Sequence, residues 1–187
     1  MTDALDSASL VEAFANTVDV ELGTDDLDTP ARLAAWLLDR GLLDRARRVG
    51  AADHELCLRL RAGIREELAA HVGVEPDPAL LAAADQVLRE LPVRVTTGGR
   101  LAPVAGLPPV RESLTRLAIT WSELVVTGQA ARLKRCAEHS CAWVFWDVSK
   151  NRSRRWCSMR VCGNRAKARR YAARQAVGAD PAAGGSA

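Results

Sequence analysis

The feature that most constrains this 187-residue chain is a group of four cysteines in its C-terminal part. Cys136 and Cys141 are separated by four residues, Cys157 and Cys162 again by four, and fifteen residues lie between the two pairs. Zn²⁺ prefers four soft ligands in a tetrahedron, and two close pairs joined by such a linker supply them without strain. The spacing therefore predicts one structural zinc per chain. The alternatives are a redox dithiol, unpaired buried thiols, or His139 as a replacement ligand.

The segment between the two cysteine pairs is predicted to form a β-hairpin. Trp143, Phe145 and Trp146 belong to an aromatic run that favours a strand, and the polar, turn-prone run SKNRS follows it. With a helix after the last cysteine, the order resembles a treble-clef zinc module. A module of about 45 residues has too small a core to fold reliably without its metal. We expect the aromatic side chains, together with Trp156, to form this core and not a platform for unpaired bases.

Charge is divided unevenly along the chain. Residues 1–130 contain 13 Lys or Arg against 20 Asp or Glu, whereas residues 131–175 contain 13 against 2. A segment this basic attracts polyanions such as nucleic acid, although a solvated helix face would show the same pattern. At 100° per residue, several basic residues of the last helix fall within about 80°, with Arg165 and Arg169 on the other side. The predicted phosphate contacts are Arg152, Arg154, Arg155, Arg160, Lys167, Arg170 and Arg174.

Two residues of this basic segment are expected to serve local structure instead of reading bases. Asn164 lies near the predicted start of the last helix, where a short polar side chain bonds to the backbone. Arg165 is expected to donate to neighbouring carbonyl groups.

Residues 1–130 are predicted to form a helical domain with one hairpin. Apolar residues recur at helical spacing over residues 9–22, 30–40, 51–72, 78–90 and 109–127. Thr29 and Pro30 suit the N-cap and first position of the second helix. In residues 93–104 apolar and polar residues alternate before a Gly-Gly turn and apolar residues follow it, a pattern that predicts a β-hairpin. The predicted fold class is mainly α with a small β-hairpin, followed by the zinc module at 131–176 and a disordered tail at 177–187.

The sequence contains no recognisable catalytic motif. His54 and Cys57 lie three residues apart in a predicted helix, but Cys57 adjoins the apolar stripe and no third group orients the histidine. A zinc with four cysteine ligands has no open coordination position. We therefore expect no enzyme activity. Neither a run of about 18 apolar residues nor a basic leader occurs, so we expect a cytoplasmic protein without membrane contact.

Two stretches of the chain resemble known families. RLKRCAEHSCAWVFWDVSKNRSRRWCSMRVCGNRAKARRYAARQ, at residues 132–175, resembles the CGNR zinc-finger family, named for the run that begins at Cys162. FANTVD, at residues 14–19, and DLDTPARLAAWL, from Asp26, resemble the ABATE domain that accompanies this finger. The resemblance spans roughly residues 9–176. It implies a bacterial transcription regulator, linked to stress, whose finger contacts DNA.

Two functions follow from these features. The first is a DNA-binding transcription regulator, in which the zinc module contacts duplex DNA and the helical domain senses a small ligand or a protein partner. The second is a zinc-stabilised protein-interaction module without direct DNA binding. A ligand pocket would lie between helices, among the apolar residues that serve as core, whereas a homodimer contact would show the same stripes. The expected core residues are Trp36, Leu60, Ile64, Leu117 and Trp121.

Overall fold

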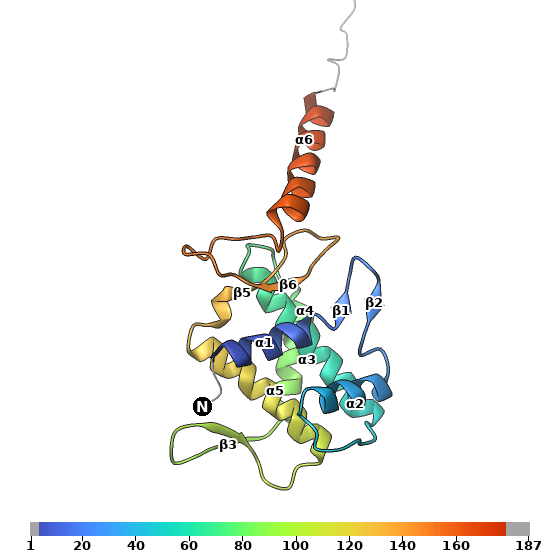
Figure 1. The fold of residues 1–187 in the computed structure, drawn as a ribbon, viewed down its shortest axis with the longest axis vertical. Coiled ribbons are helices and arrows are strands. Elements are labelled where there is room, and N and C mark those ends of the chain that lie inside the picture. The colour runs from blue at the N-terminus through green and yellow to red at the C-terminus, as the bar shows by residue number, and fades with distance from the viewer. Residues whose placement is uncertain (1–3, 179–187) are drawn as a thin grey trace, which may run out of the picture.

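The computed structural model describes residues 4–178, which form a helical body from which one C-terminal helix projects (Figure 1). The mainly α fold class with small hairpins is confirmed. The helices are α1 (Ala4–Ala15), α2 (Pro30–Asp39), α3 (Ala51–Ala70), α4 (Pro78–Glu90), α5 (Pro109–Val126) and α6 (Asn164–Gly178). The strands form three two-stranded antiparallel pairs, β1 (Val18–Asp19) with β2 (Thr24–Asp25), β3 (Val93–Val95) with β4 (Leu101–Pro103), and β5 (Leu133–Arg135) with β6 (Val144–Trp146).

Helix α3 lies at the centre of the body, where it contacts α1, α2, α4, α5 and β5 (Figure 1). Its pairing with α4 is close, because a Cβ atom added to Gly63 would lie 2.1 Å from the Cβ of Ala84. Its predicted apolar stripe, which continues just past the end of the helix, is buried as expected, at Leu56, Leu60, Ile64, Leu68 and Val72.

The first helix is shorter than its apolar spacing predicts. The prediction over residues 9–22 is wrong at the C-terminal end, because α1 ends at Ala15 and β1 and β2 follow as a short hairpin. Directly after α1, the side-chain amide of Asn16 donates to the Val144 carbonyl oxygen at 2.9 Å, and its side-chain oxygen accepts from the Val144 amide at 2.8 Å. These bonds lie outside α1, and Leu22, which was placed on the apolar face, is exposed.

The other predicted elements of the first 130 residues are present. Thr29 caps α2, with its hydroxyl oxygen accepting from the Arg32 amide at 3.3 Å, and Pro30 occupies the first turn. Asp77 caps α4 through the amides of Ala79 and Leu80. The hairpin predicted over residues 93–104 is formed by β3 and β4.

The hairpin of the zinc module lies earlier in the chain than predicted. Strand β6 contains the aromatic run, but its partner is β5, which precedes the first cysteine pair, and the register joins Lys134 to Phe145. The segment after β6 has no strand in the described structure. Leu133 from β5 and Val144 from β6 belong to the main hydrophobic core, so the base of the zinc module is packed onto α1 and α3.

The last described helix reaches into the segment predicted as a tail. The tail predicted at 177–187 lies outside the described residues except for positions 177 and 178, which complete α6. Across residues 4–178, every helix is too short or too polar to cross a bilayer.

Candidate zinc centre and nucleic-acid surface

The four cysteines lie on three different pieces of backbone that the fold brings together. Cys136 follows β5 and Cys141 precedes β6, so the first pair sits in the turn of this hairpin. Cys157 ends the long loop after β6, and Cys162 lies in a π-helical turn, η2 (Met159–Gly163), that leads into α6. The hydroxyl oxygen of Ser158 caps this turn by accepting from the Val161 amide.

The geometry of the four sulfur atoms fits a tetrahedral zinc. All four Sγ atoms lie within 4.8 Å of one another, and Cys157 Sγ is 3.6 Å from the Sγ atoms of both Cys141 and Cys162. A Zn–S bond of about 2.3 Å in a regular tetrahedron places sulfur atoms roughly 3.8 Å apart. The cluster found among the described residues contains the predicted cysteines, while His139 is exposed and outside it. The chain therefore has a site for one structural zinc.

The surroundings of the cysteines require a cation for the thiolate form. Burial raises the pKa of Cys162 to about 11 and also raises the pKa of Cys157. A bound Zn²⁺ deprotonates coordinating thiols outright, and four sulfur ligands close its coordination shell. The zinc would supply folding free energy at this site, since its four ligands come from separate segments of the chain. Cys57 differs: it is fully buried in the main core, where burial raises its pKa to about 12, as a core thiol.

The aromatic residues divide between two cores. Phe145 and Trp156 pack beside the cysteines, as predicted. Trp146 instead packs against the main core, and Trp143 is exposed, so the prediction of four aromatic residues around the zinc is wrong for these two. For Trp146 the reason is the pairing of β6 with β5, because Phe145 and Trp146 are neighbours in the strand and point to opposite sides. Trp143 precedes the strand.

A buried ion pair fixes the loop between β6 and Cys157. Lys134 Nζ lies 2.7 Å from Asp147 Oδ2, and the two side chains are 3% and 0% exposed. The ammonium group also donates to the carbonyl oxygens of Arg152 and Arg154. Asp147 accepts from the amides of Ser149 and Arg154. Burial opposes ionisation of Asp147, but these hydrogen bonds outweigh it and hold its pKa well below the ordinary range.

Helix α6 is held to the body by two ion pairs on one of its faces. Arg169 donates two hydrogen bonds of 2.6 Å to the carboxylate of Glu138, a side chain that is 1% exposed and lies between the first two cysteines. These bonds hold the pKa of Glu138 below its ordinary value. Arg165 pairs with Glu21 of the β1–β2 loop at 2.8 Å. Arg165 thus bonds a distant carboxylate and not neighbouring carbonyl groups, whereas Asn164 does bond locally, to the Arg160 carbonyl oxygen.

The seven predicted phosphate contacts fall into two groups in the structure. Arg154 donates to the carbonyl oxygens of Trp156 and Cys157, and its guanidinium lies 5.0 Å from the centre of the Phe145 ring. Arg155 donates to the Val72 carbonyl oxygen at 2.8 Å. Their guanidinium groups thus support the loop.

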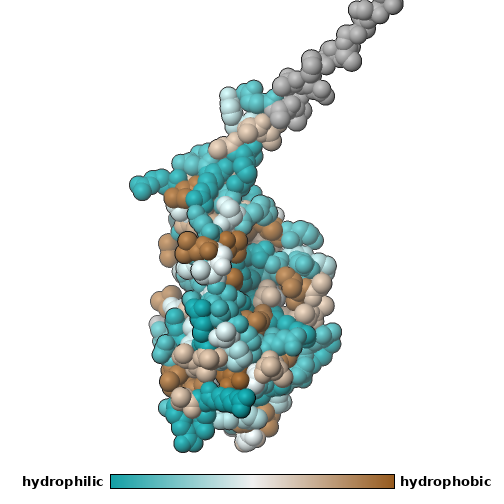
Figure 2. Space-filling view, turned by 90° about the vertical axis from the view of Figure 1, so that its right-hand side faces the viewer, coloured by the Kyte–Doolittle hydropathy of each residue, from teal (hydrophilic) through white to brown (hydrophobic). Residues whose placement is uncertain are grey.

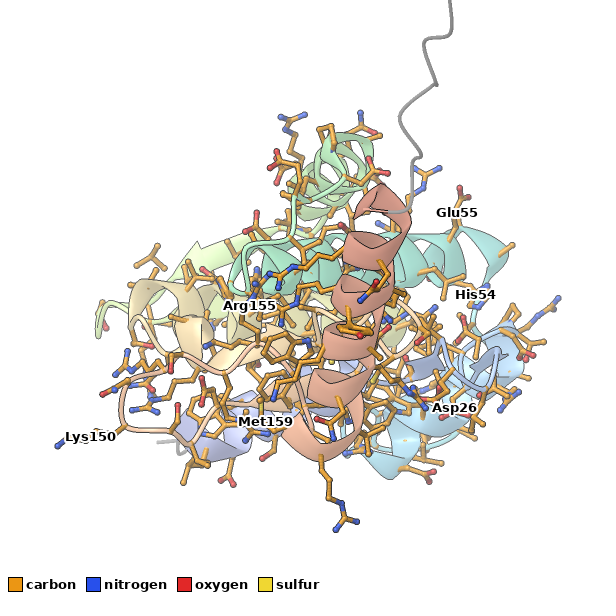
Figure 3. The ribbon with its side chains drawn as sticks, turned by 90° about the horizontal axis from the view of Figure 1, so that it is seen from above. Asp26, His54, Glu55, Lys150, Arg155 and Met159 are labelled. Carbon is orange, nitrogen blue, oxygen red and sulfur yellow. The ribbon has the colours of Figure 1, made fainter. Side chains whose placement is uncertain are left out.

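The remaining five have free side chains. Within residues 4–178, no hydrogen bond or ion pair involves the side chain of Arg152, Arg160, Lys167, Arg170 or Arg174, and all five are exposed. Lys150, which sequence reasoning left out, joins this group: it is exposed and projects outward at the rim of the view down α6 (Figure 3). The space-filling view shows a largely hydrophilic surface over this end of the molecule (Figure 2).

Charged residues of α3 join separate segments of the fold, two of them reaching the zinc module, and their role was not visible in the sequence. Arg65 is buried and donates to the carbonyl oxygens of Ala15 and Ala142, joining the end of α1 to the turn after Cys141. Arg61 binds both carboxylate oxygens of Asp25. Glu66 pairs with Arg135 of β5. A charged residue within the apolar stripe of α3 would have indicated a buried contact. These three residues lie beside that stripe, so their spacing gave no such indication.

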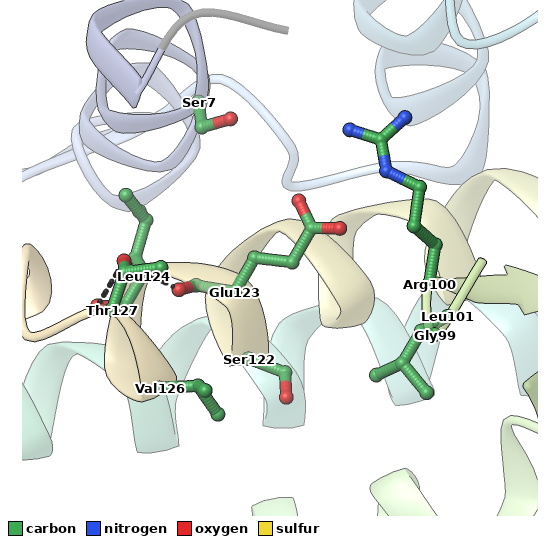
Figure 4. A pocket seen from close by; sticks show the side chains of 9 residues that line it. All are labelled: Ser7, Gly99, Arg100, Leu101, Ser122, Glu123, Leu124, Val126 and Thr127. Carbon is green, nitrogen blue, oxygen red and sulfur yellow. Dashed lines mark hydrogen bonds between the residues drawn. The ribbon is translucent and has the colours of Figure 1, made fainter. Parts of the chain in front are cut away.

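Several cavities open on the helical body. One cavity of about 460 Å³ lies between α3, α4 and α5, and it adjoins a second of about 330 Å³ that shares Trp121 in its lining. A cavity of about 400 Å³ lies between α1, α5 and the β3–β4 turn (Figure 4). Of the residues expected in the core, Leu60, Ile64 and Leu117 are buried there, and Trp36 and Trp121 are partly buried against it. Leu60, Ile64 and Trp121 also line the first of these cavities.

These observations define a zinc-finger protein in which a helical body carries a small four-cysteine module. Comparison with family models matches residues 132–175 to the CGNR zinc finger. Residues 8–138 match the ABATE family, described as "Putative stress-induced transcription regulator". This match covers more than half of the chain, which therefore belongs to the ABATE family and carries a CGNR zinc finger. A search of curated proteins found no match.

Proposed function

We propose that this protein is a transcription regulator that binds duplex DNA through the zinc module, residues 131–176. In this proposal the helical domain, residues 1–130, receives a small ligand or a protein partner. The family match supports a regulatory role. The DNA-binding part of the proposal rests on the division of the basic residues into two sets. The inner set is bonded within the protein and consists of Arg154, Arg155, Arg165 and Arg169. The outer set has free side chains in the described structure and consists of Arg152, Arg160, Lys167, Arg170 and Arg174.

The outer set is arranged along one side of a projecting helix. Arg165 and Arg169 hold α6 to acidic residues of the body, so Lys167, Arg170 and Arg174 lie on the opposite side. Helix α6 has 15 residues, which corresponds to about 22 Å, and a helix of about 10–12 Å diameter enters the major groove. Arg152 and Arg160 extend the set around the base of the helix. The helix is thus anchored by one face and offers cations on the other.

The salt dependence of DNA binding tests this proposal. If Arg152, Arg160, Lys167, Arg170 and Arg174 each neutralise one phosphate, log affinity should fall with log salt at a slope near −4.5, from about 0.9 per phosphate. The measurement is fluorescence anisotropy of a labelled duplex, titrated with the zinc-loaded protein between about 50 and 200 mM salt.

Removing two of these cations should flatten the slope by about two without changing zinc content. The variant is Arg170→Ala with Arg174→Ala. The matched control is Arg89→Ala with Arg94→Ala, which removes the same charge from two exposed, unpaired positions on the helical body. An unaltered affinity and slope in the first variant, or an equal loss in the control, would overturn the assignment of this surface.

Exposed apolar side chains beside the basic set favour a second candidate, a protein-interaction module without direct DNA binding. Met159 and Val161 at the base of α6 and Tyr171 on the helix are all exposed. A gel shift with genomic DNA fragments, in competition with an acidic protein, separates the two candidates. The second candidate predicts that the protein binds the acidic competitor and does not shift the DNA fragments, whereas the first predicts a shift of the DNA.

A further inference from the structure

We propose that the groove formed by α3, α4 and α5 binds an organic cation, a primary amine carried on an apolar body. The groove is defined here as the two adjoining cavities that share Leu88, Trp121 and Val125. This inference names the chemistry of the ligand that the proposed function assigns to the helical domain, and it rests on that part of the proposal alone.

The size and walls of the groove suit a small amphiphilic molecule. Its two parts have volumes of about 460 and 330 Å³, within the range of roughly 300–1,000 Å³ that is common for ligand pockets. The smaller part is lined by apolar residues and one serine, Ser122. It contains no charged residue, so it would take the apolar body of the ligand. Partly buried Trp121 lines both parts, and the face of an indole ring attracts cations.

The polar groups of the larger part are hydrogen-bond acceptors. Glu67 and Asp85 are exposed at its edge, and neither side chain has a hydrogen bond or ion pair to another described residue. His71 Nδ1 lies 2.8 Å from the carbonyl oxygen of Leu133. Because a carbonyl oxygen only accepts, Nδ1 carries the proton, which leaves Nε2 of the neutral ring as an acceptor.

The groove therefore favours a positively charged ligand that donates hydrogen bonds. Two unpaired carboxylates and one imidazole acceptor line it, and Lys and Arg are absent from the residues that line either part. An ammonium group brings a positive charge and three N–H donors, as many donors as there are acceptors here. A carboxylate or phosphate ligand would instead meet two like charges.

The cavity beside α1 lacks this selectivity. Arg100 and Glu123 stand on its two sides (Figure 4). Opposite charges across one cavity favour neither an anion nor a cation. The charges therefore select a ligand in the α3–α4–α5 groove and not in this cavity.

The test compares three probes that share one body, 4-phenylbutylamine, 4-phenylbutanol and 4-phenylbutanoate, by isothermal titration of the zinc-loaded full chain. We expect one amine per chain, bound at least about tenfold more tightly than the alcohol, with the carboxylate weakest. Glu67→Gln with Asp85→Asn should remove the preference for the amine and leave the affinity for the alcohol unchanged. The matched control is Asp39→Asn with Glu75→Gln, two exposed acids outside the groove, which should leave the binding of all three probes unchanged.

Two results would overturn the inference. One is equal affinity for the three probes, or the absence of binding. The other is a concentration-dependent dimer in analytical ultracentrifugation that Leu88→Glu abolishes, since the groove would then be covered by a second copy. Fluorescence anisotropy with duplex DNA, measured on the same groove variant, separates the two proposals. If DNA binding is intact while the wild type binds no amine, the groove proposal is wrong and the DNA-binding proposal stands.

Discussion

The buried ion pair between Lys134 and Asp147 allows a demanding test of how the zinc module is held together. We predict that Lys134→Met destabilises the protein strongly, although methionine fills much of the same space. The ammonium group makes three contacts, with Asp147 and with the carbonyl oxygens of Arg152 and Arg154. Its loss leaves a carboxylate of 0% exposure with only backbone amides as partners.

The magnitude follows from this burial. Removing one partner of a buried ion pair costs about 3–5 kcal/mol, because an uncompensated charge remains in a poorly solvated place. Exposed pairs contribute about 0–1 kcal/mol. The control is Arg59→Met, which removes an exposed pair with Glu55 on α3. The difference between the two variants should therefore exceed about 2 kcal/mol.

The assay is urea unfolding of the zinc-loaded protein, followed by circular dichroism and by release of zinc to a chromogenic chelator. The loop held by this pair ends at Cys157, so the Lys134→Met variant should also release zinc at lower urea than the wild type. A double variant, Lys134→Met with Asp147→Asn, removes the stranded charge while it keeps an acceptor for the amides, and should recover part of the loss. If Lys134→Met costs no more than Arg59→Met, the pair does not hold the loop and the reasoning fails.

Two further predictions concern the metal and the helical body. Cys157→Ser should lower zinc content well below one per chain and loosen the finger, whereas Cys57→Ser should leave zinc content unchanged because this thiol lies in the main core; elemental analysis of both variants decides. Gly63→Ala should destabilise the protein by about 1–3 kcal/mol, because its Cβ would meet Ala84, whereas Gly50→Ala meets nothing within 4 Å; equal melting temperatures for the two would contradict the close packing of α3 on α4.

The zinc ligands and most of the helices were predictable because their signals are local. Paired cysteines at short spacing fit one metal ion whatever surrounds them, and the apolar period of α3 marks a buried stripe in any helical body. Thr29 caps a helix that follows directly in the chain, which is why the start of α2 was readable. Asp77 caps α4 in the same way, although only the apolar spacing from residue 78 was used to predict that helix.

The basic residues show where local signals stop. Helical spacing correctly separates Arg165 and Arg169 from the other cations of α6, but it names no partner for them. Arg169 binds Glu138, 31 positions earlier, and Arg165 binds Glu21, 144 positions earlier. Composition alone gives every arginine the same charge. Only the tertiary contacts distinguish a guanidinium that supports the loop, such as that of Arg154, from one left free for a partner.

The sequence by itself determined that this chain has a zinc site and a helical body, because soft ligands in pairs and apolar side chains at a helical period act over a few residues. The tertiary structure decided where α1 ends, which strand pairs with β6, and which cations remain unpaired. Asn16, just after α1, bonds to Val144, 128 positions away, and Lys134 fixes the loop after β6 from the preceding strand. Such hydrogen bonds depend on distances in space, which no periodicity along the chain contains, and burial in the folded protein makes them strong enough to override local preference.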